Sequence, residues 1–195
     1  MMILQQHEII SRATAYAAYK NWYTESKESI ERFWKHHTDR FCDFLAITSK
    51  ATSVGANITK AIRAFKEYDT SKNTGIISFS GFNKKELETY YHTNKIVGPK
   101  IEPFAEALKG NLNLVVVDRW IWRLFYNKDS GTDRQRNMII SSIKDAAQEM
   151  KWYPSEIQAS LWAFAKESSN GHFKKVTSYA DYMEKKKEEI EELID

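Results

Sequence analysis

The sequence predicts an all-α protein of one domain, and three observations lead to this class. The 195 residues include only 7 Gly and 3 Pro, whereas sandwiches and barrels use these residues in their many turns. The balance of 42% hydrophobic and 28% charged residues is typical of a folded, soluble chain. Apolar and aromatic residues also recur at intervals of three and four along most of the chain. This length predicts a single domain over residues 1–195.

Cysteine content, hydropathy and charge exclude several other classes. Cys42 is the single cysteine, so the chain has no internal disulfide and no Cys-rich zinc or iron–sulfur site. No run approaches the ~20 apolar residues of a membrane span, and no secretory signal pattern opens the sequence. These features predict a cytoplasmic protein, in the host cytoplasm if the source is viral, with no membrane partner. The net charge of +3 gives only weak support for nucleic-acid binding.

The first third of the chain is predicted to be helical. Aromatic and aliphatic residues follow helical spacing over residues 3–48, in two or three helices, and we interpret this stripe as core. Thr52 and Ser53 form an N-cap signal for a helix over Val54–Tyr68. The segment Asp69–Gly81 is rich in Ser, Thr, Asn and Gly, which indicates a loop.

The middle of the chain is predicted to form a helical hairpin. A helix over Asn83–His92 leads into a tight turn over Asn94–Lys100, and a second helix runs from Pro99 to about Lys109. Leu114–Val117 is a short apolar run that, taken alone, is typical of a buried strand. A helix over Arg119–Tyr126 follows it. The hairpin and the segment after it therefore occupy residues 83–126.

Two amphipathic helices and a charged one are expected to complete the chain. The first two run over Arg134–Lys151 and Pro154–Glu167, and Pro154 opens the second. A polar break over Lys166–Phe173 separates them from a last helix over Ser178–Leu193. The dense charges of residues 178–195 predict a solvated helix rather than a core element.

The residues with the clearest chemical use lie in the segment 83–126. A glycine turn followed by a helix directs backbone N–H groups outward, where they hold a DNA phosphate without reading the base sequence. Lys100 stands at the start of this helix, where the positive helix end and other cations favour the neutral, nucleophilic form of an amine. Asp118 ends the apolar run, so its carboxylate is held firmly enough to stabilise a cationic sugar or to move a proton.

In these residues the sequence resembles the helix-hairpin-helix DNA glycosylases of the endonuclease III and 8-oxoguanine glycosylase type. Their signature is a hairpin that ends in Gly-x-Lys, then a helix, then an apolar run that ends in the catalytic Asp. Gly98-Pro99-Lys100 and Val115-Val116-Val117-Asp118 match this signature, with the separation of 18 residues (118 − 100) that the endonuclease III branch uses. The helix Arg119-Trp120-Ile121-Trp122-Arg123-Leu124 is similar to the 8-oxoguanine branch.

A second stretch carries the same resemblance. After an apolar helix the family has Ser-x-x-Ala-Thr-x-Val-x-x-Asn, and residues 48–57 here read Thr-Ser-Lys-Ala-Thr-Ser-Val-Gly-Ala-Asn. Lys50 stands in the loop where the family often places a Gln that fills the gap left by a flipped base. Two features depart from the family: Ile96 replaces the first glycine of the hairpin, and the C-terminal four-cysteine cluster of many members is absent.

The resemblance implies a fold and an activity. The implied fold is all-α, a two-lobed helix-hairpin-helix glycosylase-like unit with a cleft between the lobes. The implied activity is that of a DNA glycosylase with AP-lyase chemistry on double-stranded DNA. Lys100 would attack C1′ of a flipped nucleotide to form a Schiff base, and Asp118 would assist departure of the damaged or modified base. Reaching C1′ requires the nucleotide out of the stack, at a cost of a few kcal/mol.

The other expected site residues follow from the same resemblance, which implies a monomer without a cofactor. No metal is expected either, since the adjacent residues His36 and His37 point to different helix faces. The residues expected to contact DNA are Lys50, Asn57, Lys95, Val97 and Gly98, and those expected to line the base pocket are Trp120, Trp122 and Gln158.

Two other functions stay open on the sequence alone. Phage relatives of this superfamily are thought to modify thymine-type bases instead of excising them, and the altered hairpin fits such a member. A non-catalytic DNA-binding descendant is the other, because Ile96 and Lys50 replace the family's residues. For the two main residues, the plain alternatives are a phosphate-binding or surface lysine at Lys100 and a helix N-cap at Asp118.

Overall fold

The computed structural model describes residues 4–81, 83–168 and 176–194. Every regular element in these ranges is a helix, which confirms the all-α class. The chain divides into two compact units that interleave in sequence. Unit 1 consists of Met1–Thr24 and Gly110–Val176, and unit 2 consists of Glu25–Lys109 and Thr177–Asp195.

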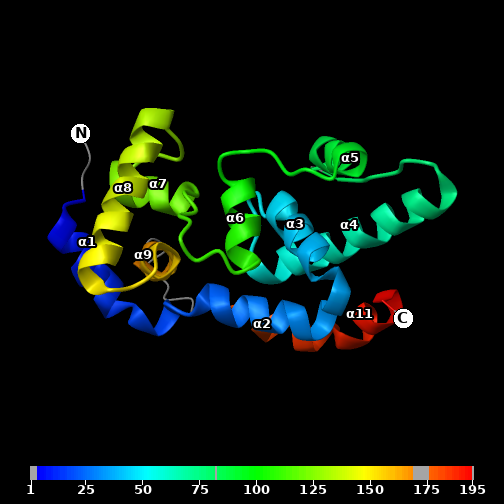
Figure 1. The fold of residues 1–195 in the computed structure, drawn as a ribbon, viewed down its shortest axis with the longest axis horizontal. Helices are drawn as coiled ribbons and strands as arrows, with labels where there is room; N and C mark the ends of the chain where they lie inside the picture. Colours follow the sequence, from blue (N-terminus) through cyan, green and yellow to red (C-terminus); the bar gives the residue numbers. More distant parts are fainter. Residues whose placement is uncertain (1–3, 82, 169–175, 195) are drawn as a thin grey trace. The chain divides into compact units, whose positions relative to one another are not determined.

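Unit 1 is a cluster of helices around α9. Figure 1 shows α1, α7 and α8 around α9, and each of the three packs against it. The core takes buried side chains from all four helices, among them Ile9, Phe125, Ile143 and Leu161. Helices α7, α8 and α9, for which separate bounds were predicted, begin and end within one residue of those bounds. Their ranges are α1 (Gln6–Ala15), η1 (Ala17–Tyr19), α7 (Arg119–Tyr126), α8 (Asp133–Met150) and α9 (Pro154–Ser168).

The apolar run before α7 is buried but is not a strand. Val115, Val116 and Val117 are nearly inaccessible to solvent, and Val115 and Val117 belong to the core of unit 1. A strand needs a neighbouring strand to pair its backbone groups, and none occurs in the described part of the chain. Burial of these valines fixes the backbone immediately before Asp118.

Unit 2 is built around α3 and has an aromatic core. Helix α3 packs against α4, α5 and α6 (Figure 1). The Trp34 ring stacks on Phe41 at 3.7 Å between centroids and lies 4.8 Å from Phe65. The aromatic stripe of residues 3–48 is confirmed as core from Trp22 onward, whereas Tyr16 and Tyr19 are only half-buried. The elements are α2 (Trp22–Trp34), which begins in unit 1, η2 (Lys35–His37), α3 (Thr38–Thr48), α4 (Val54–Thr74), α5 (Lys84–Thr93), α6 (Ile101–Leu108), α10 (Ala180–Met183), η3 (Glu184–Lys186) and α11 (Lys187–Ile194).

Helix α4 is longer than the sequence predicted, and the expected loop from Asp69 was wrong over its first part. The helix continues to Thr74 and ends at Gly75, whose φ of 71° is left-handed. Ser, Thr and Asn are weak helix formers but do not break a helix, and Gly75 is the first residue that supplies a C-cap. The buried side chains of Tyr68 and Ser71 hold this last part of α4 against unit 2.

The C-terminal segment also differs from the prediction. It is not a solvated helix, because Tyr179, Met183 and Ile190 are buried in unit 2. The Tyr182 ring lies so close to Gly55 of α4 that a Cβ at Gly55 would come within 2.4 Å of it. The helical turns are interrupted by η3. The expected polar break over Lys166–Phe173 falls largely on residues 169–175, which lie outside the described residues.

A buried ionic cluster joins α3 to both helices of the hairpin. Asp43 on α3 is 7% exposed; its Oδ1 lies 2.6 Å from Lys109 Nζ at the end of α6, and its Oδ2 accepts a 2.9 Å hydrogen bond from Tyr90 on α5. Burial raises the pKa of the Asp43 carboxyl, while the hydrogen bonds and charge of its partners oppose that shift. The cluster therefore holds the hairpin on α3.

We expect Asp43→Ala to destabilise unit 2 by about 3–5 kcal/mol, because it leaves the Lys109 ammonium and the Tyr90 hydroxyl without their buried partner. Urea unfolding followed by circular dichroism measures the loss. Glu106→Gln is the matched control: Glu106 also pairs with Lys109, at 3.1 Å, but is 44% exposed, so its loss costs less than about 1 kcal/mol. Equal losses for the two variants would contradict the structural importance of Asp43.

Candidate active site

The hairpin turn, residues 94–100, contains two residues with a positive φ. Asn94 ends α5 with a φ of 52°, and Gly98 has a φ of 144°, which favours glycine. Ile96, which replaces the family's first glycine, does not adopt a positive φ. The turn therefore meets its conformational requirement without that glycine.

Helix α6 begins at Ile101 and not at Pro99, as the sequence predicted. Pro103 has no N–H, so it cannot donate to the carbonyl of Pro99. Regular helical hydrogen bonding consequently starts later, and Lys100 becomes the N-cap residue of α6.

The Lys100 side chain connects the hairpin with the α3–α4 loop, residues 49–53. Lys100 Nζ donates to Ser49 Oγ at 2.8 Å and lies 3.5 Å from the Ser49 carbonyl oxygen. The Ser49 hydroxyl donates in turn to the Ala46 carbonyl, which leaves its oxygen as the acceptor for the amine. The two stretches that carry the family resemblance, 51 residues apart at this contact, therefore meet in unit 2.

The remaining hairpin and loop residues expected to contact DNA are mostly on the surface. Lys50 and Lys95 are exposed, and the apolar side chain of Val97 is 73% exposed. Ala51, next to Lys50, has a left-handed φ of 50°. Two lysines and an exposed aliphatic side chain thus lie on the two segments that the contact between Lys100 and Ser49 joins.

Asn57 does not fit its expected role in DNA contact. It is 2% exposed; its amide nitrogen donates to the Leu45 carbonyl at 3.0 Å and to the Tyr179 hydroxyl at 2.6 Å, and its oxygen accepts from Thr48 at 2.7 Å. These partners fix the end of α3, the start of α4 and the C-terminal segment together. Asn57 therefore positions the α3–α4 loop from inside the protein.

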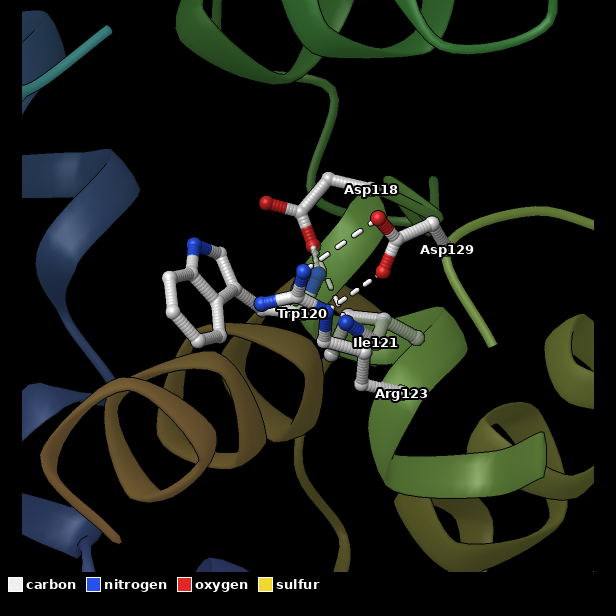
Figure 2. A network of polar contacts seen from close by, with 5 residues as sticks. All are labelled: Asp118, Trp120, Ile121, Arg123 and Asp129. Carbon is white, nitrogen blue, oxygen red and sulfur yellow. Dashed lines mark hydrogen bonds and ion pairs between the residues drawn. The ribbon is translucent and has the colours of Figure 1, made fainter. Parts of the chain in front are cut away.

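Asp118 belongs to unit 1, where it caps α7. Its Oδ1 accepts hydrogen bonds from the amides of Trp120 and Ile121, both at 3.0 Å. Figure 2 shows this oxygen turned toward the start of α7 and the other carboxylate oxygen directed away from it. The N-cap reading of Asp118 is confirmed, and capping uses only one of the two oxygens.

Trp120, an expected base-pocket residue, is half-buried and covered by a cation. The Arg123 guanidinium lies 5.1 Å from the centre of the Trp120 ring and pairs with Asp129 through Nε at 2.5 Å (Figure 2). The hydrogen bond from Arg123 lowers the pKa of the Asp129 carboxyl. A base stacked on this face of Trp120 would have to displace Arg123.

The other two residues expected in a base pocket lie in the core of unit 1, so those predictions do not fit the structure. Trp122 is 3% exposed and packs among the buried side chains of the unit. Gln158 is also 3% exposed, and its Oε1 accepts a 2.8 Å hydrogen bond from the Tyr23 hydroxyl. Helix α7 turns Ile121, Trp122 and Phe125 inward, which leaves Trp120 as the outward tryptophan.

Lys166 on α9 is a further charged residue close to Asp118, and no sequence motif predicts a role for it. Its Nζ lies 4.5 Å from the centre of the Trp162 ring. Burial lowers the pKa of the Lys166 amine, and the nearby Asp118 carboxylate opposes this shift. The i, i+4 spacing of Trp162 and Lys166 is visible in the sequence, but their proximity to Asp118 depends on how α7 packs on α9.

Within residues 4–81, 83–168 and 176–194, His, Cys, Asp and Glu side chains form no group of three or more suited to a metal ion. The rings of His36 and His37 lie 3.9 Å apart, and Cys42 is fully buried. None of the described helices combines the length and the apolar character that a membrane crossing needs.

Comparison with known proteins gives a family but no activity. No curated protein matches the chain, and no solved structure matches it. A family model described as a family of unknown function, DUF7178, matches residues 6–169, which is most of the chain and includes both Lys100 and Asp118. The chain belongs to the DUF7178 family.

Proposed function

We propose that the protein is a DNA glycosylase with AP-lyase activity, in which Lys100 is the nucleophile and Asp118 the assisting carboxylate. The observation that carries the proposal is the 2.8 Å hydrogen bond from Lys100 Nζ to Ser49 Oγ. It joins the hairpin lysine to the loop that, by resemblance, faces the gap left by a flipped base. Random surface lysines have no reason to connect these two segments.

The proposed reaction needs an amine and a carboxylate. The neutral Lys100 amine attacks C1′ as the bond from C1′ to the base breaks, and the departing base takes up a proton. Loss of the amine proton and opening of the sugar ring then give a Schiff base between Nζ and C1′. Asp118 stabilises the positive charge that develops on the sugar. Lys50 and Lys95 supply positive charge for the DNA backbone.

Borohydride trapping tests this function, because the hydride reduces the Schiff base to a stable amine that links protein to DNA. The substrates are duplexes that carry an abasic site, uracil, 8-oxoguanine or an oxidised pyrimidine. We expect a covalent band with the abasic duplex and with at least one modified base, together with release of that free base.

Mass spectrometry of the nucleosides separates the other functions. If heavier nucleosides form and no abasic sites appear, the protein modifies bases instead of excising them. Salt-dependent duplex binding with no product on any substrate would indicate a DNA-binding module. Absence of DNA binding at low salt would exclude all three functions.

A further inference from the structure

A small pocket opens on unit 2 between α4, the end of α3 and the start of α5. Its volume is about 30 Å³, room for about two water-sized groups. Thr48, the last residue of α3, lines the pocket. The next residue, Ser49, accepts the hydrogen bond from Lys100. The polar residues around the pocket are Thr48, Lys60, Arg63, Glu67, Ser80 and Asn83.

Two cations of α4 face this pocket from adjacent turns. Lys60 has no ion pair within the described residues. Arg63 is 54% exposed, and the carboxylate of Glu67 stays 4.0 Å from its Nε. The Arg63 guanidinium also lies against Gly81, where a Cβ would come within 2.8 Å of its Nη2. The pocket therefore has one ammonium and one guanidinium group, and their positive charges are only weakly neutralised.

The acidic residue of the pocket, Glu67, is hydrogen-bonded to Ser80, which also lines the pocket. Glu67 accepts hydrogen bonds from the backbone amide of Ser80 at 3.1 Å and from its hydroxyl. Two donors thus draw this carboxylate toward the segment before α5. Two cations against one anion leave the three ionic groups with a net charge of +1 (2 − 1).

Asn83 places a side-chain amide group at the pocket. It is 6% exposed and stands at the N-cap of α5, but its side chain makes no capping hydrogen bond. None of the described residues forms another hydrogen bond with that side chain. The side-chain amide can therefore donate a hydrogen bond to an acceptor in the pocket.

We propose that this pocket binds one phosphate group of the DNA backbone through Lys60, Arg63 and Asn83. The assignment of the phosphate to DNA rests on the proposed function. The positive charge of the pocket is independent of that function. One or two of the free phosphate oxygens fit the volume of the pocket. The ester linkages and the rest of the strand stay outside it. The pocket would hold the strand at the end of α3, next to the loop that positions Lys100.

Salt dependence of DNA binding tests the assignment. The probe is a fluorescein-labelled duplex with a tetrahydrofuran abasic analogue, titrated by fluorescence anisotropy at several KCl concentrations. Each lost phosphate contact lowers the slope of log K against log salt by about 0.9, and we expect this change for the double variant Lys60→Gln/Arg63→Gln. Lys144→Gln is the charge-matched control, since Lys144 is exposed on α8 of unit 1, and its slope stays at the wild-type value.

Asn83→Asp separates binding from folding. An aspartate caps a helix at least as well as asparagine, so we expect an unchanged or higher Tm, whereas the new negative charge weakens duplex binding by roughly tenfold. An unchanged slope for Lys60→Gln/Arg63→Gln, or an equal decrease for Lys144→Gln, would overturn the inference. So would unchanged affinity for Asn83→Asp.

The same variants distinguish this inference from the proposed function. Borohydride trapping at saturating protein persists in the pocket variants if both are right. Wild-type trapping combined with an unchanged salt slope rejects only the pocket. If the wild-type protein traps no substrate but the pocket variants have a lowered salt slope, the phosphate-binding pocket is supported and the glycosylase function is rejected. Inorganic phosphate that shifts the Asn83 amide NMR signal, with no effect of the variants on DNA binding, rejects DNA as the source of the phosphate.

Discussion

Lys100→Gln abolishes the borohydride-trapped adduct, with a decrease of more than about hundredfold in trapped DNA, because removal of the nucleophile removes the covalent route. A glutamine amide has no free lone pair for attack on C1′, and it keeps a polar side chain at position 100. Lys100 is only half-buried, so the fold should be retained. Gel analysis of wild type and variant on the abasic duplex, with Tm measured in parallel, provides the test.

Two controls make this result specific to Lys100. Lys95→Gln removes an exposed lysine of the same turn and leaves trapping intact at saturating DNA. Ser49→Ala removes the hydroxyl that holds the amine and slows trapping by roughly tenfold, since a loosely held nucleophile reaches C1′ less often. If Lys100→Gln forms the adduct as fast as wild type, another amine is the nucleophile and the proposed role of Lys100 is wrong.

Local chemistry allowed many elements to be predicted from the sequence. Ser53 caps α4 by accepting from the Ala56 amide, and Thr132 caps α8 in a capping box with Gln135. The strongly amphipathic helix α7 has the bounds that its apolar spacing predicts. In each case the determining residues lie within a few positions of one another, so periodicity and caps suffice.

The features that the sequence did not predict depend on distant partners. Asn57 is buried because Tyr179, 122 residues away, accepts from it, and no local pattern shows this. The inward position of Gln158 likewise depends on Tyr23. Lys60, Arg63 and Asn83 are separate polar residues in the sequence, and only the packing of α5 beside α4 gathers them at one pocket.

The resemblance to the glycosylases is the basis for the proposed roles of Lys100 and Asp118, but two of the three residues that it implied for a base pocket lie in the core of unit 1. A cavity is formed by several segments, so a motif within one helix does not determine which of its side chains line it. Trp122 illustrates the difference. It matches the family's helix in sequence, while its place in this fold is set by the core around Ile139 and Ile143.

Asp118→Asn lowers the rate constant of base excision by about 10²–10⁴-fold while the fold stays intact. Asparagine caps helices as well as aspartate does, so the hydrogen bonds to the amides of Trp120 and Ile121 are preserved. The variant loses only the negative charge that stabilises the sugar cation or moves the proton. Single-turnover excision on the modified duplex measures the rate constant, and urea unfolding measures stability.

Asp118→Ala completes the comparison, because it removes the charge and the cap together. We expect it to lose about 1 kcal/mol of stability in addition to the same loss of excision rate. Lys166 gives a readout independent of activity: the Asp118 carboxylate no longer opposes the effect of burial on its amine, so the pKa of Lys166 falls below the wild-type value in both variants. An Asp118→Asn protein that excises at the wild-type rate would show that Asp118 is a helix cap and nothing more.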